Sequence, residues 1–376
     1  MLNYITDFYL ANMGIFNIKQ HFNKSKKLKT ELIKYSNIDS VKVIDLPDEA
    51  YAQVDETKIE ENEVYKKTYE LFGKRIQEIV PKEELGNFYR NFADIKSAQL
   101  SLKIAYSRFL TTGGIAGGAY DTSENILYLK EGFISKAIGA LTHELLHASS
   151  TYYDKKKGIV YIGLSQTYIN KDDPKHSEVY GLALNEGYTQ YFNNKYFVDN
   201  DSVTLSFFGK DHTVQADNII TKQVYEEEQI IAKALETIVG EEKMRSFYFR
   251  GDLNGLIKEL EQYAPRETIY QFINFTDTLC FYSNNKNAAN EELKEVKTFI
   301  NSLILRMYMK SQKKNNKDLT NDEILEFMSS CLPYKDSGTN KILISSDYLD
   351  GKPINITNEN EGKKKVKKLA NNKDTI

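Results

Sequence analysis

The chain has 376 residues, of which 41% are hydrophobic and 27% are charged, and its formal net charge is -3. This length exceeds one ordinary hydrophobic core and favours two or three domains, and the composition is typical of a soluble globular protein. A net charge so close to neutral gives no overall attraction to nucleic acid or to an anionic membrane, so we expect no nucleic-acid partner.

The sequence gives no sign of a signal peptide or of a membrane span. Residues 1–16 contain Asn3, Asp7 and Asn12 and lack the basic start of a signal peptide, and no apolar run approaches the ~18 residues that suggest a transmembrane helix. A cytoplasmic location is therefore the default expectation, although export without a cleaved signal would leave the same pattern. The oligomeric state is not indicated.

Cysteine chemistry is not indicated either. The two cysteines, Cys280 and Cys331, lie far apart and outside any C-x-x-C pattern. The sequence therefore predicts neither a disulfide framework nor a thiolate zinc site.

The first hundred or so residues predict a lead-in segment followed by short elements. We interpret residues 1–40 as a lead-in and residues 41–46 as a short strand. An amphipathic pattern over residues 57–80 predicts a helix that Pro81 ends. A second helical stretch is expected to follow to about Phe109.

A glycine-rich stretch at residues 112–121 predicts tight turns or a strand that another backbone approaches closely. Residues 124–129 follow and read as an edge strand. Ser135 is the expected N-cap of the next helix. The predicted buried stripe of that helix consists of Ile134, Ala137, Ile138, Leu141, Leu145 and Ala148.

This helix carries the motif H-E-x-x-H as His143, Glu144 and His147. Positions i and i+4 share one face of a helix, so the two histidines can bind one metal ion. Glu144 lies about 100° further round the helix, where a carboxylate can act on a metal-bound water without being a ligand. The pattern predicts a catalytic metal site.

A catalytic zinc ion takes three protein ligands and keeps a fourth position for water, so a third ligand must come from elsewhere in the chain. After a strand or hairpin expected at residues 158–169, Asp173 and Pro174 are expected to open a second helix that runs to about Phe197. Glu186 on that helix is the best candidate. Glu178, at the expected start of the helix, is the competitor.

The H-E-x-x-H motif, followed by a helix that bears N-E-x-x-T at Asn185–Thr189, resembles the gluzincin zinc metallopeptidases, whose thermolysin-like members pair H-E-x-x-H with N-E-x-x-S-D. The resemblance implies that His143, His147 and Glu186 are zinc ligands. It also implies that Glu144 is the general base.

The resemblance spans Tyr120 to Tyr196, and two positions depart from the thermolysin pattern. Thr189 stands where that pattern has Ser, and Gln190 stands where it has the Asp that orients a zinc-bound histidine. An amide can accept a hydrogen bond from the imidazole N–H but raises its basicity less than a carboxylate does. The separation of the two motifs is longer than in thermolysin and closer to that of lethal-factor-type toxin proteases.

The relatives use a Tyr or His to stabilise the oxyanion of the transition state, and the sequence does not single out this residue. Tyr180, His176 and His212 are the candidates. Tyr180 precedes Glu186 by six positions, which places it about 240° away from the ligand face of a helix.

Together these patterns predict an α+β fold with four segments. A lead-in at 1–40 precedes a zincin-like metallopeptidase domain at 41–212, with a small mixed sheet, an edge strand, an active-site helix and a Glu-bearing helix. A mainly helical domain follows at 213–335, and the catalytic cleft is expected between the two. Residues 336–376 predict a weak hairpin at Asp350-Gly351 and a disordered lysine-rich tail.

The expected function is hydrolysis of peptide bonds in a peptide or protein substrate, with Zn2+ as the cofactor and Glu144 as the general base. Two alternatives stay open on the sequence alone. One is a zinc hydrolase that acts on a non-peptide amide, and the other is a non-catalytic zincin-fold module with a binding or structural role.

Overall fold

The computed structural model describes residues 72–93, 95–100, 118–121, 125–130, 134–154, 157–168, 178–197, 203–207, 210–214, 225–283 and 290–349. The predicted lead-in at 1–40, the strand at 41–46, the Asp350-Gly351 hairpin and the lysine-rich tail lie outside these residues.

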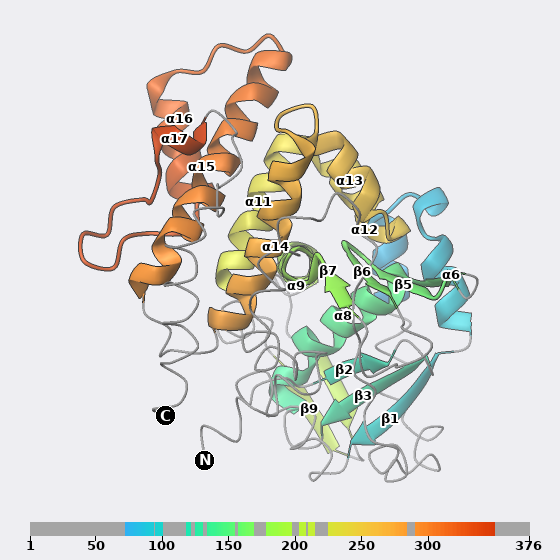
Figure 1. Ribbon diagram of the computed structural model, residues 1–376. Coiled ribbons are helices and arrows are strands. Elements are labelled where there is room, and N and C mark those ends of the chain that lie inside the picture. Colours follow the sequence, from blue (N-terminus) through green and yellow to red (C-terminus); the bar gives the residue numbers. More distant parts are fainter. Residues whose placement is uncertain are drawn as a thin grey trace.

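Helices and short strands alternate up to residue 214, and the rest of the described chain is almost entirely helical (Figure 1). A helix at residues 72–79 confirms the end of the one predicted at 57–80. The elements that follow are η2 Lys82–Glu84, α6 Gly86–Ala93, β1 Lys96–Leu100, β2 Gly118–Asp121, β3 Ile126–Lys130, α8 Ile134–Ser150, β4 Thr151–Asp154, β5 Ile159–Ile162, β6 Ser165–Tyr168, β7 Glu178–Tyr180, α9 Leu182–Tyr196, β8 Val203–Phe207, β9 Lys210–Val214, α11 Glu226–Val239, α12 Glu241–Arg250, α13 Leu253–Leu260, α14 Arg266–Ser283, α15 Asn290–Lys314, α16 Asn321–Cys331 and α17 Ser346–Leu349.

The first sheet has the strand order β1-β3-β2, with β1 parallel and β2 antiparallel to β3. The prediction of an edge strand at 124–129 is therefore wrong, because β3 is the central strand and β2 lies at the edge. The one side chain of β3 whose burial is described, Leu127, is fully buried. The prediction of a helix that reaches Phe109 is also wrong at residues 96–100. These residues form strand β1, because they pair with β3.

The second sheet is antiparallel, in the order β4-β5-β6-β7. Its β5–β6 hairpin confirms the prediction at 158–169 and turns at Gly163, which has a φ of 53°. The predicted helix opening at Asp173-Pro174 lies outside the described residues, and the helix expected to run to about Phe197 starts later than residue 178. Residues 178–180 form β7, which pairs with β6, and α9 starts only at Leu182.

Helix α8 lies between the first sheet and the helical layer, and it contacts both β2 and α9 (Figure 1). It begins at Ile134, so Ser135 is inside the helix and not at its N-cap as predicted. The predicted buried stripe is confirmed at Leu145 and Ala148, which are fully buried.

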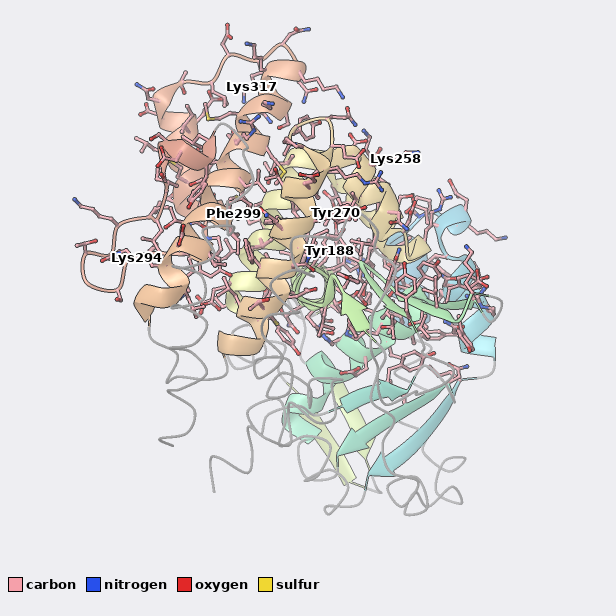
Figure 2. All side chains as sticks on the ribbon, viewed as in Figure 1. Tyr188, Lys258, Tyr270, Lys294, Phe299 and Lys317 are labelled. Atoms are coloured by element: carbon pink, nitrogen blue, oxygen red, sulfur yellow. The ribbon has the colours of Figure 1, made fainter. Side chains whose placement is uncertain are left out.

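Helix α9 packs against α11 and α14, so the helical part of the chain directly supports the helix that carries Glu186. The prediction of long helices beyond residue 213 is confirmed from Glu226 onwards, after the β8–β9 hairpin. Tyr188 of α9 and Phe299 of α15 belong to one hydrophobic core, whereas Lys258 and Lys317 lie at the periphery (Figure 2). The described elements form a mixed α+β arrangement, and no helix among them is long and apolar enough to cross a membrane.

Candidate metal centre

The helical spacing of the motif brings the two histidines of α8 together. His143 and His147 are each 7% exposed, and their Nε2 atoms are 3.0 Å apart. Their rings meet edge to face at a centroid distance of 4.7 Å. The i, i+4 geometry predicted from the sequence is therefore present, with both Nε2 atoms on the same side of the helix.

Glu186 of α9 completes the group. Its Oε2 atom lies 3.2 Å from His143 Nε2, and its Oε1 atom lies 3.5 Å from His147 Nε2. Burial opposes ionisation of this carboxyl, but the charge of His147 and the hydrogen bonds from both histidines outweigh burial and hold the pKa of Glu186 well below its usual range. The side chain is thus a carboxylate, the form that binds a metal ion.

The three donor groups fit a divalent metal ion. Ligand atoms at about 2.0–2.1 Å from a tetrahedral zinc ion are about 3.3 Å from one another. Here the two Nε2 atoms are 3.0 Å apart and each lies 3.2–3.5 Å from a different oxygen of Glu186, and one ligand atom from each residue lies within 4.8 Å of the others. Two imidazole nitrogens and one carboxylate oxygen would supply three ligands of such a site and leave the fourth position for water or substrate. The buried His143-His147-Glu186 group, the one such cluster among the described residues, could therefore hold a metal ion.

The amide of Gln190 orients His143. Its Oε1 atom lies 2.9 Å from His143 Nδ1, and its Nε2 atom donates to Asn194 Oδ1 at 2.9 Å, which fixes the oxygen towards the histidine. A neutral His143 that donates Nδ1–H to Gln190 keeps its Nε2 lone pair for a metal ion, whereas the Nε2–H···Glu186 hydrogen bond belongs to the metal-free, protonated ring. The sequence position predicted to orient a histidine does contact one.

The amide of Asn185 contacts His147 differently. Its Nδ2 atom lies 3.3 Å from His147 Nδ1, while its Oδ1 atom accepts a hydrogen bond from the Leu164 N–H at 3.1 Å. This pairing suits a His147 whose Nδ1 is unprotonated. If His147 binds a metal ion through Nε2, its proton must be on Nδ1. The Asn185 side-chain oxygen can accept a hydrogen bond from that N–H only after the amide group rotates by about 180°.

Glu144 lies beside the cluster and is not one of its three members. Its Oε2 atom accepts a hydrogen bond of 3.0 Å from the backbone N–H of Tyr120 in β2. Burial raises the pKa of Glu144 to about 7; the charge of Glu186 adds to this rise, and His143 and the Tyr120 N–H oppose it. A carboxyl with a pKa near neutrality is suited to proton transfer.

The edge strand β2 therefore faces the site. Tyr120 directs its N–H away from β3 and towards Glu144, and among the described strands β2 pairs with β3 alone. The N–H and C=O of one residue in an antiparallel strand point to the same side. The Tyr120 carbonyl thus faces outward from the sheet, on the side of Glu144.

The other sequence candidates have different positions. Glu178 lies at the start of β7, and Tyr180 ends that strand as a buried core residue that is 7% exposed. His212 lies on β9, opposite Leu205 of β8. His176 lies outside the described residues.

Tyr225 is a site neighbour that sequence reasoning missed. Its ring stacks on His143 with a centroid distance of 6.2 Å and an interplanar angle of 16°. It adopts a left-handed backbone conformation, with a φ of 57°, immediately before α11. No local signal could have selected this residue among the 26 tyrosines, because it reaches the site only through the packing of α11 on α9.

Comparisons with protein-family models, with curated proteins and with solved structures found no match.

Proposed function

We propose that the protein is a zinc-dependent metallopeptidase of the gluzincin type with a zincin-like fold. The observation that carries the proposal is the convergence of His143, His147 and Glu186, which place one ligand atom each within 4.8 Å of the others, the donor set of a catalytic zinc site. A bound zinc ion would supply the Lewis acidity that activates water and polarises the substrate carbonyl.

Glu144 supplies the proton transfer in this proposal. Its carboxylate takes a proton from the attacking water and then passes it to the leaving amine. Its partly buried position, which raises its pKa to about 7 in the metal-free protein, makes it a stronger base there than a solvated glutamate. A site that only stabilised the fold would need no such base and would be closed by a fourth ligand.

The outer side of β2, which pairs with β3 alone among the described strands, supports an extended peptide as the substrate. An extended chain can add to a strand edge through main-chain hydrogen bonds, and Tyr120, whose N–H donates to Glu144, brings this side of β2 next to the proposed base. A peptide paired there would pass close to the catalytic groups. A small non-peptide amide would gain nothing from such an edge.

The test is cleavage of a random peptide library by zinc-loaded protein, followed by mass spectrometry. We expect the wild type to cleave the library, and Glu144→Gln to lose at least about 100-fold in rate, since proton transfer contributes 10²–10⁴-fold, while it still holds zinc. Glu242→Gln on the exposed face of α12 is the matched control and should cleave like the wild type.

Two outcomes would contradict the peptidase proposal. Zinc-loaded wild type that leaves every peptide intact but hydrolyses small amides would support the alternative hydrolase. Protein that holds zinc and hydrolyses neither would support the non-catalytic module.

A further inference from the structure

Helix α9, which carries Glu186, begins without a cap from its own sequence. The first N–H groups of a helix have no partner inside the helix and need an acceptor. The N-cap residue is Gly181, which has no side chain to provide one. Gly181 also has a φ of 71°, and a Cβ there would lie 2.3 Å from the Leu164 carbonyl oxygen, so the position excludes the usual capping residues.

Asp277 of α14 supplies the missing acceptor from a distant part of the chain. Its Oδ2 atom accepts from the Gly181 N–H and its Oδ1 atom accepts from the Ala183 N–H, both at 2.8 Å. The Asp277 side chain is buried, with the residue 7% exposed. One carboxyl therefore satisfies two N–H groups at the start of α9.

The position of this cap matters for the metal centre. Glu186 follows Ala183 by three residues, so it lies about one turn further along the same helix. Asn185 and Gln190, which contact the two histidines, are on α9 as well. A shift of α9 along or about its axis would move all three residues relative to α8.

We infer that Asp277 is a positioning residue for the metal centre, because it fixes α9 where Glu186 reaches His143 and His147. The inference rests on the proposed metal site. It assigns the helical C-terminal part of the chain a role in metal affinity, although none of the three ligands lies there.

The experiment compares Asp277→Ala with Asp252→Ala. Asp252 caps α13 through an Oδ1 contact of 2.8 Å with the Gly255 N–H and is a matched control outside the site. Each full-length variant is titrated with Zn2+ against a chelator, and with Co2+ while the d–d absorption that reports the coordination geometry is recorded. Thermal unfolding of the metal-free proteins measures the loss of stability separately.

We expect Asp277→Ala to bind Zn2+ at least about 10-fold more weakly, as is typical for residues that orient ligands, with an altered Co2+ spectrum. Asp252→Ala should lose stability but keep the affinity and spectrum of the wild type. Asp277→Asn retains one acceptor oxygen and the same shape, so it should lie between the wild type and Asp277→Ala, and it serves as the test if Asp277→Ala does not fold.

If the wild type binds zinc and the Asp277 variants have the same affinity and Co2+ spectrum as the wild type, the positioning role is overturned. The proposed function would then remain intact. Equal losses of affinity in the Asp277 and Asp252 variants would also overturn it, since the effect would then be one of general stability. Wild type that binds neither Zn2+ nor Co2+ would overturn the proposed function together with this inference.

Discussion

At the scale of single residues, the site depends on which nitrogen of each histidine carries a proton. Gln190 sets this for His143, because its oxygen accepts from Nδ1–H and leaves Nε2 for the metal ion. An amide provides this hydrogen bond without the charge that a carboxylate would add. If the proposed zinc site forms, Gln190 is the position at which its departure from the thermolysin pattern would change metal affinity.

We predict that Gln190→Leu lowers the affinity for Zn2+ by about 10–100-fold, because His143 loses the acceptor that orients its ring. Gln190→Glu retains an acceptor of the same length and adds charge, so it should bind zinc at least as tightly as wild type. Chelator competition measures both constants. Wild-type affinity in Gln190→Leu would show that the contact is incidental.

The histidine pair could be predicted from the sequence because i, i+4 geometry is local, whereas other parts of the site could not. The N-E-x-x-T pattern selected Glu186, although a strand and a left-handed glycine delay the start of its helix to Leu182. Tyr225 arrives at His143 through contacts between distant helices. No short-range pattern encodes such an approach.

At the scale of elements, the site is held by the close approach of α9 and α11. Gly187 makes this approach possible, because a Cβ there would lie 2.3 Å from the Glu228 carbonyl oxygen. Glycine within a helix is otherwise unfavourable. The contact sets the distance between the helix that bears Glu186 and the helix that Tyr225 precedes.

We predict that Gly187→Ala lowers the free energy of unfolding by about 1–3 kcal/mol, the usual cost of overpacking. The matched control is Gly86→Ala at the start of α6, where a Cβ would meet no atom within 4 Å. It should be neutral or slightly stabilising. Urea unfolding of both variants checks this, and equal stabilities would refute the packing argument.

Strand and helix boundaries show where local patterns fail. The apolar residues at 124–129 correctly predicted a strand, β3. They could not reveal its place in the sheet, because strand order depends on its pairing with β1 and β2. β7 is a strand because it pairs with β6, and this pairing replaces the helix that the Asp173-Pro174 signal predicted to continue there. In both cases long-range hydrogen bonds decided the outcome.

At the scale of the whole molecule, three carboxyl groups surround or support the site: Glu228 and Asp277 are buried and Glu144 is partly buried. Burial raises the pKa of Glu144, Glu228 and Asp277 to about 7 each, and the Gly181 and Ala183 N–H groups oppose this rise at Asp277. The unfolded chain, with ordinary values of 4.5 and 3.8, releases these protons at lower pH. Between these values the folded protein binds more protons than the unfolded chain.

We predict that the stability of the metal-free protein falls as the pH rises from about 5 to about 7, by on the order of 1 kcal/mol per pH unit for each such acid. Glu186 has the opposite effect on stability, because its pKa is lowered in the folded protein. Its contribution is lost only when the pH falls below the usual pKa of a glutamate, outside this pH range. Urea unfolding at several pH values, with a chelator present, measures the slope. The double variant Glu228→Gln/Asp277→Asn should flatten it, and a slope of the opposite sign in wild type would contradict the prediction.

The metal content of the purified protein tests the central claim most directly. We expect wild type to hold about one zinc ion per chain, Glu186→Gln to lose most of it, and Glu178→Gln, the variant of the competing ligand, to keep it. Atomic spectroscopy of the three proteins after dialysis against trace zinc gives the answer. A Glu186→Gln protein with the zinc content of the wild type would show that His143, His147 and Glu186 do not form the metal centre.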